Sequence, residues 1–159
     1  MGKIIEQKLT VAAWLVLSTI YLATRSHITY PIFFGHKVLA LFDLWSLQHF
    51  VSGFVIGTAV TKRGQGVRWW RILLGAVIWE AWEWSMEMGS IGSHMAYWFH
   101  GQEHWSNRLL SDPALYVIGS LIGARHPHLR SRMMLFSFSW IGMNLLAPHS
   151  MWFQDYLMR

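Results

Sequence analysis

Three glutamates within one apolar segment are the residues of this sequence whose chemistry stands out. Glu80, Glu83 and Glu87 lie in the tryptophan-rich run of residues 79–87. At about 100° per residue along a helix, they fall within about 60° of one another and form one stripe. A carboxyl group on an apolar membrane helix is costly to bury, so such residues face a bundle interior or water. The stripe therefore predicts a polar site on the inner face of this helix.

Ionisable residues in two other apolar segments reach a depth similar to that of Glu83. At about 1.5 Å rise per residue from the basic ends, Glu83 and His49 each lie roughly 18 Å along their helices, and Asp112 roughly 20 Å. We therefore expect these three side chains to converge. Glu and His are ligands for zinc, iron or manganese, and the interior of a helical bundle can hold such a site.

The candidate cofactor is a divalent transition metal, and the candidate catalytic and metal-binding residues overlap. A carboxylate among them would act as a general base. The catalytic candidates are Glu80, Glu83 and Asp112, and the metal-ligand candidates are His49, Glu83, Glu87, His100 and His104.

The connection after the third apolar segment holds His100-Gly101-Gln102-Glu103-His104. This matches the His-x-x-Glu-His pattern of inverted zinc proteases, in which two histidines on one helix face hold zinc and the glutamate is the base. Gly101 disfavours a helix, and no later glutamate completes the ligand set, which argues against a protease. A looser metal site that includes His100 or His104 is one alternative, and an exposed polar loop is another.

Three interpretations of the whole cluster stay open at the level of sequence. It is a metal or acid–base site, a relay for protons or small ions, or a polar network that pins the helices together without catalysis. In the last case His49 and Arg108 would hydrogen-bond the carboxylates. Asp112 also has a structural alternative, because Ser111 or Asp112 can cap a helix start at which Pro113 suits the first turn.

The elements that position these residues are five apolar segments, at residues 9–23, 41–61, 69–88, 109–124 and 133–147. Each approaches the roughly 20 residues that a helix needs to cross a bilayer. Hydrophobic residues make up 53% of the 159 residues and charged residues 13%, against about 25% charged in soluble domains. The 11 Trp are typical of membrane–water boundaries. We therefore predict an all-α fold, an integral membrane bundle of about five transmembrane helices, as a single domain over residues 1–159.

Basic residues distribute unequally between the two sides of this bundle, which predicts a cytoplasmic N-terminus by the positive-inside rule. The formal net charge of +5 then reflects topology and lipid headgroups rather than nucleic acid. The N-terminal side carries Lys3, Lys8, Lys62, Arg63, Arg68, Arg71, Arg125, Arg130 and Arg132, and the other side carries Arg25, Lys37, Arg108 and Arg159.

Two of the segments carry glycine pairs at helical spacing, Gly53-x-x-x-Gly57 and Gly119-x-x-x-Gly123. Small residues four apart let helix backbones approach closely in lipid. We expect the second and fourth helices to pack on each other within one protomer, with a dimer seam as the alternative.

The order of short motifs over residues 45–125 resembles a known kind of protein. These motifs are Leu47-Gln48-His49-Phe50-x-x-Gly53, then Trp79-Glu80-Ala81-Trp82-Glu83, then Asn107-x-x-x-Ser111-Asp112. Together they resemble an uncharacterised family of small bacterial inner-membrane proteins, and more loosely the VanZ-like proteins. The resemblance implies a bundle of about five helices with a His/Glu/Asp set between them, and it implies no activity.

The functional prediction from sequence is a small accessory or assembly subunit of a membrane complex in the cell inner membrane, multi-pass, with membrane lipids and other membrane subunits as partners. One alternative is a membrane-embedded metal-dependent enzyme acting on a lipid or envelope substrate at the outer leaflet, with Arg108 holding an anionic headgroup. The other alternative is a proton or small-ion carrier. Nucleic acid is not an expected partner.

Overall fold

The computed structural model describes residues 2–25, 28–62, 66–99 and 101–146, and these residues are mostly helical. Each of the five apolar segments coincides with one long helix, so the all-α prediction is confirmed. A two-stranded parallel pair and a short helix, which the sequence did not predict, occupy the connections. In chain order the elements are α1 (Gly2–Ala23), β1 (Ile32–Phe34), β2 (Ala40–Phe42), α2 (Leu44–Lys62), α3 (Trp69–Glu87), α4 (Ser93–Phe99), a π-helix (Asn107–Ser111), α5 (Asp112–Arg125), a 3₁₀ turn (Pro127–Leu129) and α6 (Arg130–Leu146).

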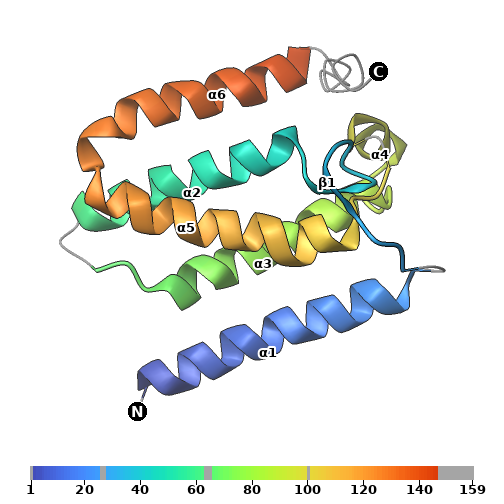
Figure 1. Cartoon of the computed structure of the whole chain (residues 1–159), viewed down its shortest axis with the longest axis horizontal. Helices are drawn as coiled ribbons and strands as arrows, with labels where there is room; N and C mark the ends of the chain where they lie inside the picture. The colour runs from blue at the N-terminus through green and yellow to red at the C-terminus, as the bar shows by residue number, and fades with distance from the viewer. Residues whose placement is uncertain (1, 26–27, 63–65, 100, 147–159) are drawn as a thin grey trace.

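The helices lie side by side with α2, α3 and α5 at the centre (Figure 1). Helix α1 packs on α3 along one side, and α6 packs on α2 along the other. The N-terminus, the α2–α3 connection and the α5–α6 turn lie at one end of the bundle. The β1–β2 pair and α4 lie at the opposite end, where the buried charged residues also gather.

The contact between α2 and α5 is made backbone to backbone at the glycines. A Cβ added at Gly57 would lie 2.7 Å from the carbonyl carbon of Ser120, which no side chain tolerates. Gly53 meets the backbone of Tyr116 in the same way, and Gly119 and Gly123 meet α2. The prediction that the two glycine pairs pack against each other within one chain is therefore confirmed.

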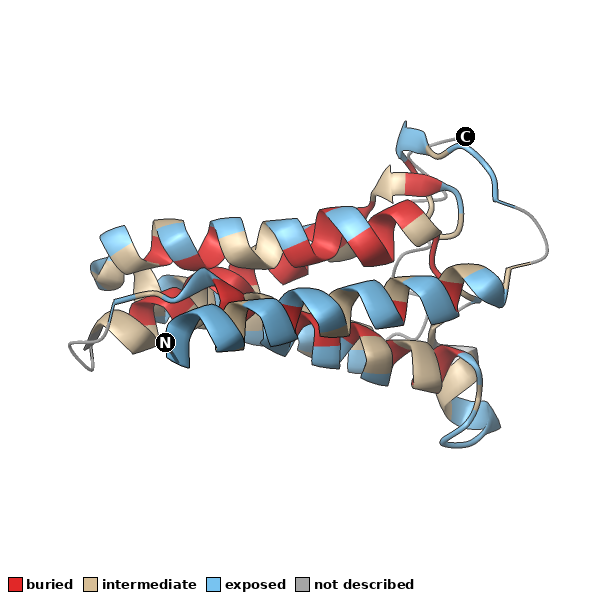
Figure 2. Cartoon of the chain, turned by 90° about the horizontal axis from the view of Figure 1, so that it is seen from below, coloured by how far each residue is buried: buried red, intermediate tan, exposed pale blue. Residues whose placement is uncertain are grey.

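Many large apolar side chains are exposed in this fold, and many charged and polar side chains are buried. Many residues on the outer faces of the helices are exposed (Figure 2). They include large apolar side chains such as Leu9, Ile78 and Leu135, at 65%, 62% and 69% exposure. Inside, charged and polar side chains are as prominent as apolar ones. Those buried are Thr10, Lys37, Asp43, Ser46, Gln48, His49, Thr58, Glu80, Glu83, Glu87, Glu103, His104, Ser106, Asn107, Arg108, Ser111, Asp112 and Ser120.

Among the described residues, one helix is long and apolar enough by itself to count as a membrane span, and that helix is α1. A single helix near the N-terminus is weak evidence, because a signal sequence has the same features. Helices α5 and α6 are short, at 14 and 17 residues. Helix α3 is long enough, but its three buried glutamates and Arg71 lower its hydropathy.

The start of the fourth segment differs from the sequence prediction. We expected the helix to begin near Ser111 or Asp112, with one of them as its cap. Instead, helical structure begins at Trp105 and passes through the π-helix into α5 without a break, and neither side chain makes a capping hydrogen bond. The wider π-helical turn is frequent at functional sites. Here Asn107, Arg108 and Ser111 are buried on it.

Candidate metal centre

Three metal-ligand side chains from α2 and α3 meet in the bundle interior. One ligand atom each from His49, Glu80 and Glu83 lies within 4.8 Å of the others. Nδ1 of His49 lies 3.6 Å from Oε1 of Glu80. Two ligand atoms on one tetrahedral ion, with bonds of about 2.0–2.1 Å, are about 3.3 Å apart. The spacing of this triad therefore suits one divalent transition metal.

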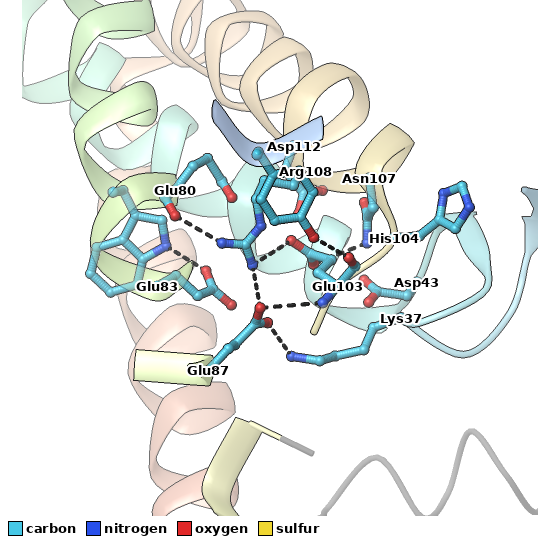
Figure 3. A network of polar contacts seen from close by, with 12 residues as sticks. Lys37, Asp43, Glu80, Glu83, Glu87, Glu103, His104, Asn107, Arg108 and Asp112 are labelled. Carbon is cyan, nitrogen blue, oxygen red and sulfur yellow. Dashed lines mark hydrogen bonds and ion pairs between the residues drawn. The ribbon is translucent and has the colours of Figure 1, made fainter. Parts of the chain in front are cut away.

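The carboxylate of Glu80 has no other use in the structure. Its side chain is fully buried, and neither Oε1 nor Oε2 accepts a hydrogen bond from any residue that the structure describes. Arg108 donates to the backbone carbonyl of Glu80 at 2.8 Å rather than to its carboxylate (Figure 3). An ionised carboxylate that is buried without partners is strongly disfavoured. A bound cation would remove that cost.

Glu83 is a member of the triad that also borders a cavity. Trp79, one turn earlier on α3, donates its indole N–H to Oε2 of Glu83 at 3.0 Å. That hydrogen bond fixes the orientation of the carboxylate. Glu83 and His49 also line the cavity described below, whereas Glu80 does not.

Asp112 approaches the histidine from the opposite side. Its Oδ2 lies 3.2 Å from Nε2 of His49, close enough for an ion pair but not aligned as a hydrogen bond. Oδ1 accepts a hydrogen bond from Ser46 at 3.0 Å. A carboxylate on the second ring nitrogen is the arrangement that orients metal-binding histidines. Asp112 thus fits a positioning role.

The hydrogen bonds around Asp112 continue to the N-terminus of α2 through Ser46. Asp43 Oδ1 accepts from the amide of Ser46 at 2.9 Å, and Ser46 Oγ accepts from the amide of Asp43 at 3.1 Å. This reciprocal pair caps the helix. It also fixes the hydroxyl of Ser46 beside Asp112.

A second carboxylate triad, formed by Glu83, Glu87 and Glu103, has ligand atoms within 4.8 Å of one another but is already compensated. Glu87 pairs with Lys37 at 2.7 Å and with Arg108 at 2.8 Å. Glu103 pairs with Arg108 at 3.2 Å (Figure 3). These cations occupy the positions that a second metal would need. The triad of His49, Glu80 and Glu83 is therefore the better candidate.

The charge balance of the interior supports the same conclusion. Among the described residues, six buried carboxyl groups face two buried cations, Lys37 and Arg108. Full ionisation would leave four negative charges uncompensated, so the interior must take up protons or cations. The carboxyl groups are those of Asp43, Glu80, Glu83, Glu87, Glu103 and Asp112.

The pKa values of Glu103 and Lys37, in the connections that close the site, are shifted from their ordinary values. It raises the pKa of the Glu103 carboxyl well above its ordinary value, opposed by Arg108 and reinforced by Glu83 and Glu87. Burial alone would lower the pKa of Lys37, but the carboxylates of Glu87 and Glu103 outweigh it and the pKa is raised. Lys37 is therefore a fixed positive charge, and Glu103 is a group that holds a proton readily.

A cavity of about 540 Å³ adjoins the triad. His49, Glu83 and Met86 lie on its buried side, and aromatic and aliphatic side chains form most of its walls. The remaining lining residues are Trp45, Gln48, Ser52, Trp79, Trp82, Met95, Phe99, Tyr116, Ile141, Asn144 and Leu145. Its volume is within the usual range of small-molecule sites, roughly 300–1,000 Å³.

The structure thus brings His49, Glu83 and Asp112 to one region of the interior, as their depths along the helices predicted, and Glu80 and Glu87 are buried on the same stripe of α3 as Glu83. His104 belongs to neither of the two triads of described residues, and its ring contacts the hydroxyls of Ser106 at 2.8 Å and Thr29 at 3.2 Å. His100 lies outside the described residues.

Two further expectations are corrected by burial and backbone. Arg108 is fully buried in its ion pairs, so it is not available to a lipid headgroup. Gly101 has φ +94°, and residues 101–104 form no helix, so the inverted-protease motif lacks its helix. Sequence reasoning did not assign Lys37 or Asp43 to the site, and it noted Glu103 only within that motif.

No protein-family model, curated protein or solved structure matches this chain. The resemblance to VanZ-like proteins stays a prediction.

Proposed function

We propose that this chain is a membrane-embedded metal-dependent enzyme that hydrolyses a lipidic substrate. The observation that carries the proposal is a buried triad of metal-ligand side chains beside an apolar cavity. The Glu80 carboxyl group accepts no hydrogen bond from the described residues and lies next to His49 and Glu83, and the cavity reaches His49 and Glu83. A site of this kind combines a place for a cation with a place for an apolar molecule.

The membrane location is supported by the exposed apolar side chains. Exposed Leu, Ile, Phe and Trp on the outer helix faces would be poorly soluble, whereas lipid is a suitable solvent for them. The charges agree with five crossing helices. The start of α1, the end of α5 and the start of α6 lie at one end of the bundle (Figure 1). These helix ends carry Lys3, Lys8, Arg125 and Arg132, so that end would face the cytoplasm. At the other end, Lys37 and Arg108 form buried ion pairs with Glu87, so they add no exposed positive charge there.

The donor set favours zinc, iron or manganese, which accept imidazole and carboxylate ligands. Three protein ligands would leave an open coordination position for water or substrate, as catalytic sites require. A bound divalent ion supplies Lewis acidity and makes water a stronger acid. Of the three ligands, His49 and Glu83 border the cavity, so the open position would face the substrate.

The hydrolytic step follows from these positions. Water would add to the carbonyl carbon of an ester or amide held in the cavity, and its proton would pass to the oxygen of the Glu83 carboxylate that does not hold the metal. The carbon–oxygen or carbon–nitrogen bond of the leaving group then breaks, and the leaving group takes that proton from Glu83. Water is the only co-reactant, and no oxidant or reductant is needed.

The test is metal-dependent lipid hydrolysis by the purified chain in mild detergent. Diacylglycerol, ceramide and phosphatidylglycerol serve as probes, with and without added Zn²⁺ or Mn²⁺. We expect turnover of at least one probe that is lost with chelator and in Glu83→Gln, and that is retained in Glu6→Gln. Glu6 is a matched control, because its carboxylate pairs with Arg71 on the exposed surface at the far end of the bundle.

Absence of turnover and of bound metal in the native chain would overturn the proposal. The accessory-subunit hypothesis would then be favoured, because the ion pairs of Lys37, Glu87 and Arg108 would pin the helices without chemistry. Such a subunit should co-purify with a stoichiometric partner.

A further inference from the structure

We infer that the Tyr116 hydroxyl donates a hydrogen bond to the carbonyl oxygen of the substrate in the proposed reaction. Tyr116 would then be a further catalytic residue, which α5 contributes beside the triad from α2 and α3. The inference rests on the proposed function for the reaction itself. The hydrogen bond to a bound carbonyl group needs only the cavity and the tyrosine, so it can be tested without metal and without turnover.

Tyr116 is the residue through which α5 reaches the cavity. Of the residues of α5, it alone lines the cavity that His49 and Glu83 also line. Its backbone is held against α2, because a Cβ added at Gly53 would lie 2.8 Å from the carbonyl carbon of Tyr116. The close packing at this glycine therefore sets the position of the tyrosine relative to His49, which lies one turn earlier on α2.

The direction of the side chain places the hydroxyl toward the triad. Tyr116 follows Asp112 by one helical turn, on the same face of α5. Helical side chains lean toward the N-terminus of their helix, so the Tyr116 ring leans toward the turn of Asp112. There Oδ2 of Asp112 lies 3.2 Å from Nε2 of His49. The Tyr116 hydroxyl also interacts electrostatically with the Glu80 carboxyl group, which agrees with this placement.

The hydroxyl is also an uncommitted donor. Besides His49, three lining residues carry a donor that takes part in no hydrogen bond with the described part of the chain, and these are Trp45, Trp82 and Tyr116. Trp82 is 53% exposed, so it lies at the rim of the cavity. Trp45 precedes His49 by one turn and leans away from it, toward the start of α2. Tyr116 is therefore the donor best placed for a carbonyl group beside Glu83.

Such a donor stabilises the transition state of the proposed hydrolysis. When water adds to the carbonyl carbon, negative charge develops on the carbonyl oxygen. A hydroxyl already directed at that oxygen stabilises the charge without reorganisation, and loss of one donor of this kind lowers kcat about 10²–10³-fold in other enzymes. A divalent ion in the triad would stabilise the same charge. The contribution of the tyrosine is therefore measured most cleanly with the metal removed.

The test is the infrared carbonyl band of methyl palmitate, labelled with ¹³C at its carbonyl carbon and bound to the full chain in mild detergent with chelator. In the native chain we expect this band at lower frequency than in protein-free micelles, because a hydrogen bond weakens the C=O bond. Tyr116→Phe removes the hydroxyl and should return the band to the micelle frequency. Tyr30→Phe is the matched control and should keep the native band, because Tyr30 is 97% exposed and does not line the cavity.

Turnover and metal content are measured on the same variants after metal is restored. Tyr116→Phe should bind as much metal as the native chain, with kcat lowered at least about tenfold and KM little changed. Thermal melting establishes that each variant is folded, and Tyr116→Leu is a second variant that should lose the band shift. A native chain without a shifted band, or a shift retained in Tyr116→Phe, would overturn the inference whatever the turnover. A shift that depends on Tyr116, in a chain without metal or turnover, defeats the proposed reaction alone.

Discussion

His49 and Glu80 face each other across α2 and α3, with Nδ1 of the imidazole 3.6 Å from Oε1 of the carboxylate. The carboxylate accepts no hydrogen bond from any described group, and the other ring nitrogen lies 3.2 Å from Asp112. A carboxyl group that accepts no hydrogen bond contributes little to the stability of the fold. Together with the histidine opposite, however, it is a suitable pair of metal ligands. That contrast allows a structural role and a metal-binding role to be separated by experiment.

Glu80→Gln should abolish stabilisation by metal without weakening the metal-free fold. The neutral amide has about the size of the carboxyl group and carries no charge to bury, so metal-free Glu80→Gln should unfold at the same denaturant concentration as the native chain or a higher one. Metal at a hundred times its dissociation constant should stabilise the native chain by about 2.7 kcal/mol and the variant hardly at all. Denaturant unfolding in detergent, with and without metal, measures both. A strongly destabilised metal-free variant would support the structural role.

Glu87→Gln should be among the most destabilising neutral substitutions in the interior. Glu87 contacts both buried cations, Lys37 at 2.7 Å and Arg108 at 2.8 Å. Removing one partner of a buried ion pair costs about 3–5 kcal/mol, because the remaining charge is left uncompensated. Glu6→Gln breaks an exposed pair with Arg71 and should leave the unfolding free energy nearly unchanged. Similar unfolding curves for the two variants would contradict the assignment of Glu87 as the anchor of both cations.

Gly57→Ala and Gly75→Ala should have opposite effects on stability. A Cβ at Gly57 would lie 2.7 Å from the carbonyl carbon of Ser120, so α2 and α5 must separate, at about 1–3 kcal/mol. Gly75 has open space around it, and alanine there should stabilise α3 by roughly 0.5–1 kcal/mol. Thermal melts in detergent compare the two directly. Equal tolerance of both substitutions would show that α2 and α5 do not touch along their glycines.

The metal-free protein should lose stability as pH rises. Burial raises the pKa of Glu103 above its ordinary 4.5, so between these two values the folded chain holds a proton that the unfolded chain has lost. Stability then falls as pH rises through that window. Metal binding reverses the trend, because protons compete with metal for the ligands. Unfolding at pH 5, 6.5 and 8, in chelator and in excess metal, should show opposite slopes. A stability of the metal-free chain that rises with pH would contradict this.

Much of the helical core and of the site could be predicted from the sequence, because both depend on periodicity. Apolar segments located the five long helices, and helical rise placed His49, Glu83 and Asp112 at one depth. The glycine spacing predicted the α2–α5 contact. These features depend on residues within one element or on the simple stacking of parallel and antiparallel helices.

The loop contributions could not be predicted, because no periodicity governs the path of a connection. Lys37 follows β1, and Glu103 follows the short α4, yet both enter the interior and complete the ion pairs. The amide of His104 donates to the carbonyl of Lys37 at 2.8 Å, which holds the two connections together. The π-helix that brings Arg108 inward also has no sequence signature that we recognise. The sequence left two roles open for Arg108, and the ion pairs with Glu87 and Glu103 agree with its contact to the carboxylates rather than to a headgroup.

The most direct test of the central claim is the metal content of the purified chain after equilibration with excess Zn²⁺ or Mn²⁺ and removal of the unbound ion. Native protein, Glu80→Gln, His49→Ala and Glu6→Gln are compared by elemental analysis in mild detergent. We expect about one divalent ion per chain in the native protein and in Glu6→Gln, and a loss of at least tenfold in occupancy in Glu80→Gln and His49→Ala. No bound metal in the native chain, or undiminished metal in the Glu80 and His49 variants, would contradict the account.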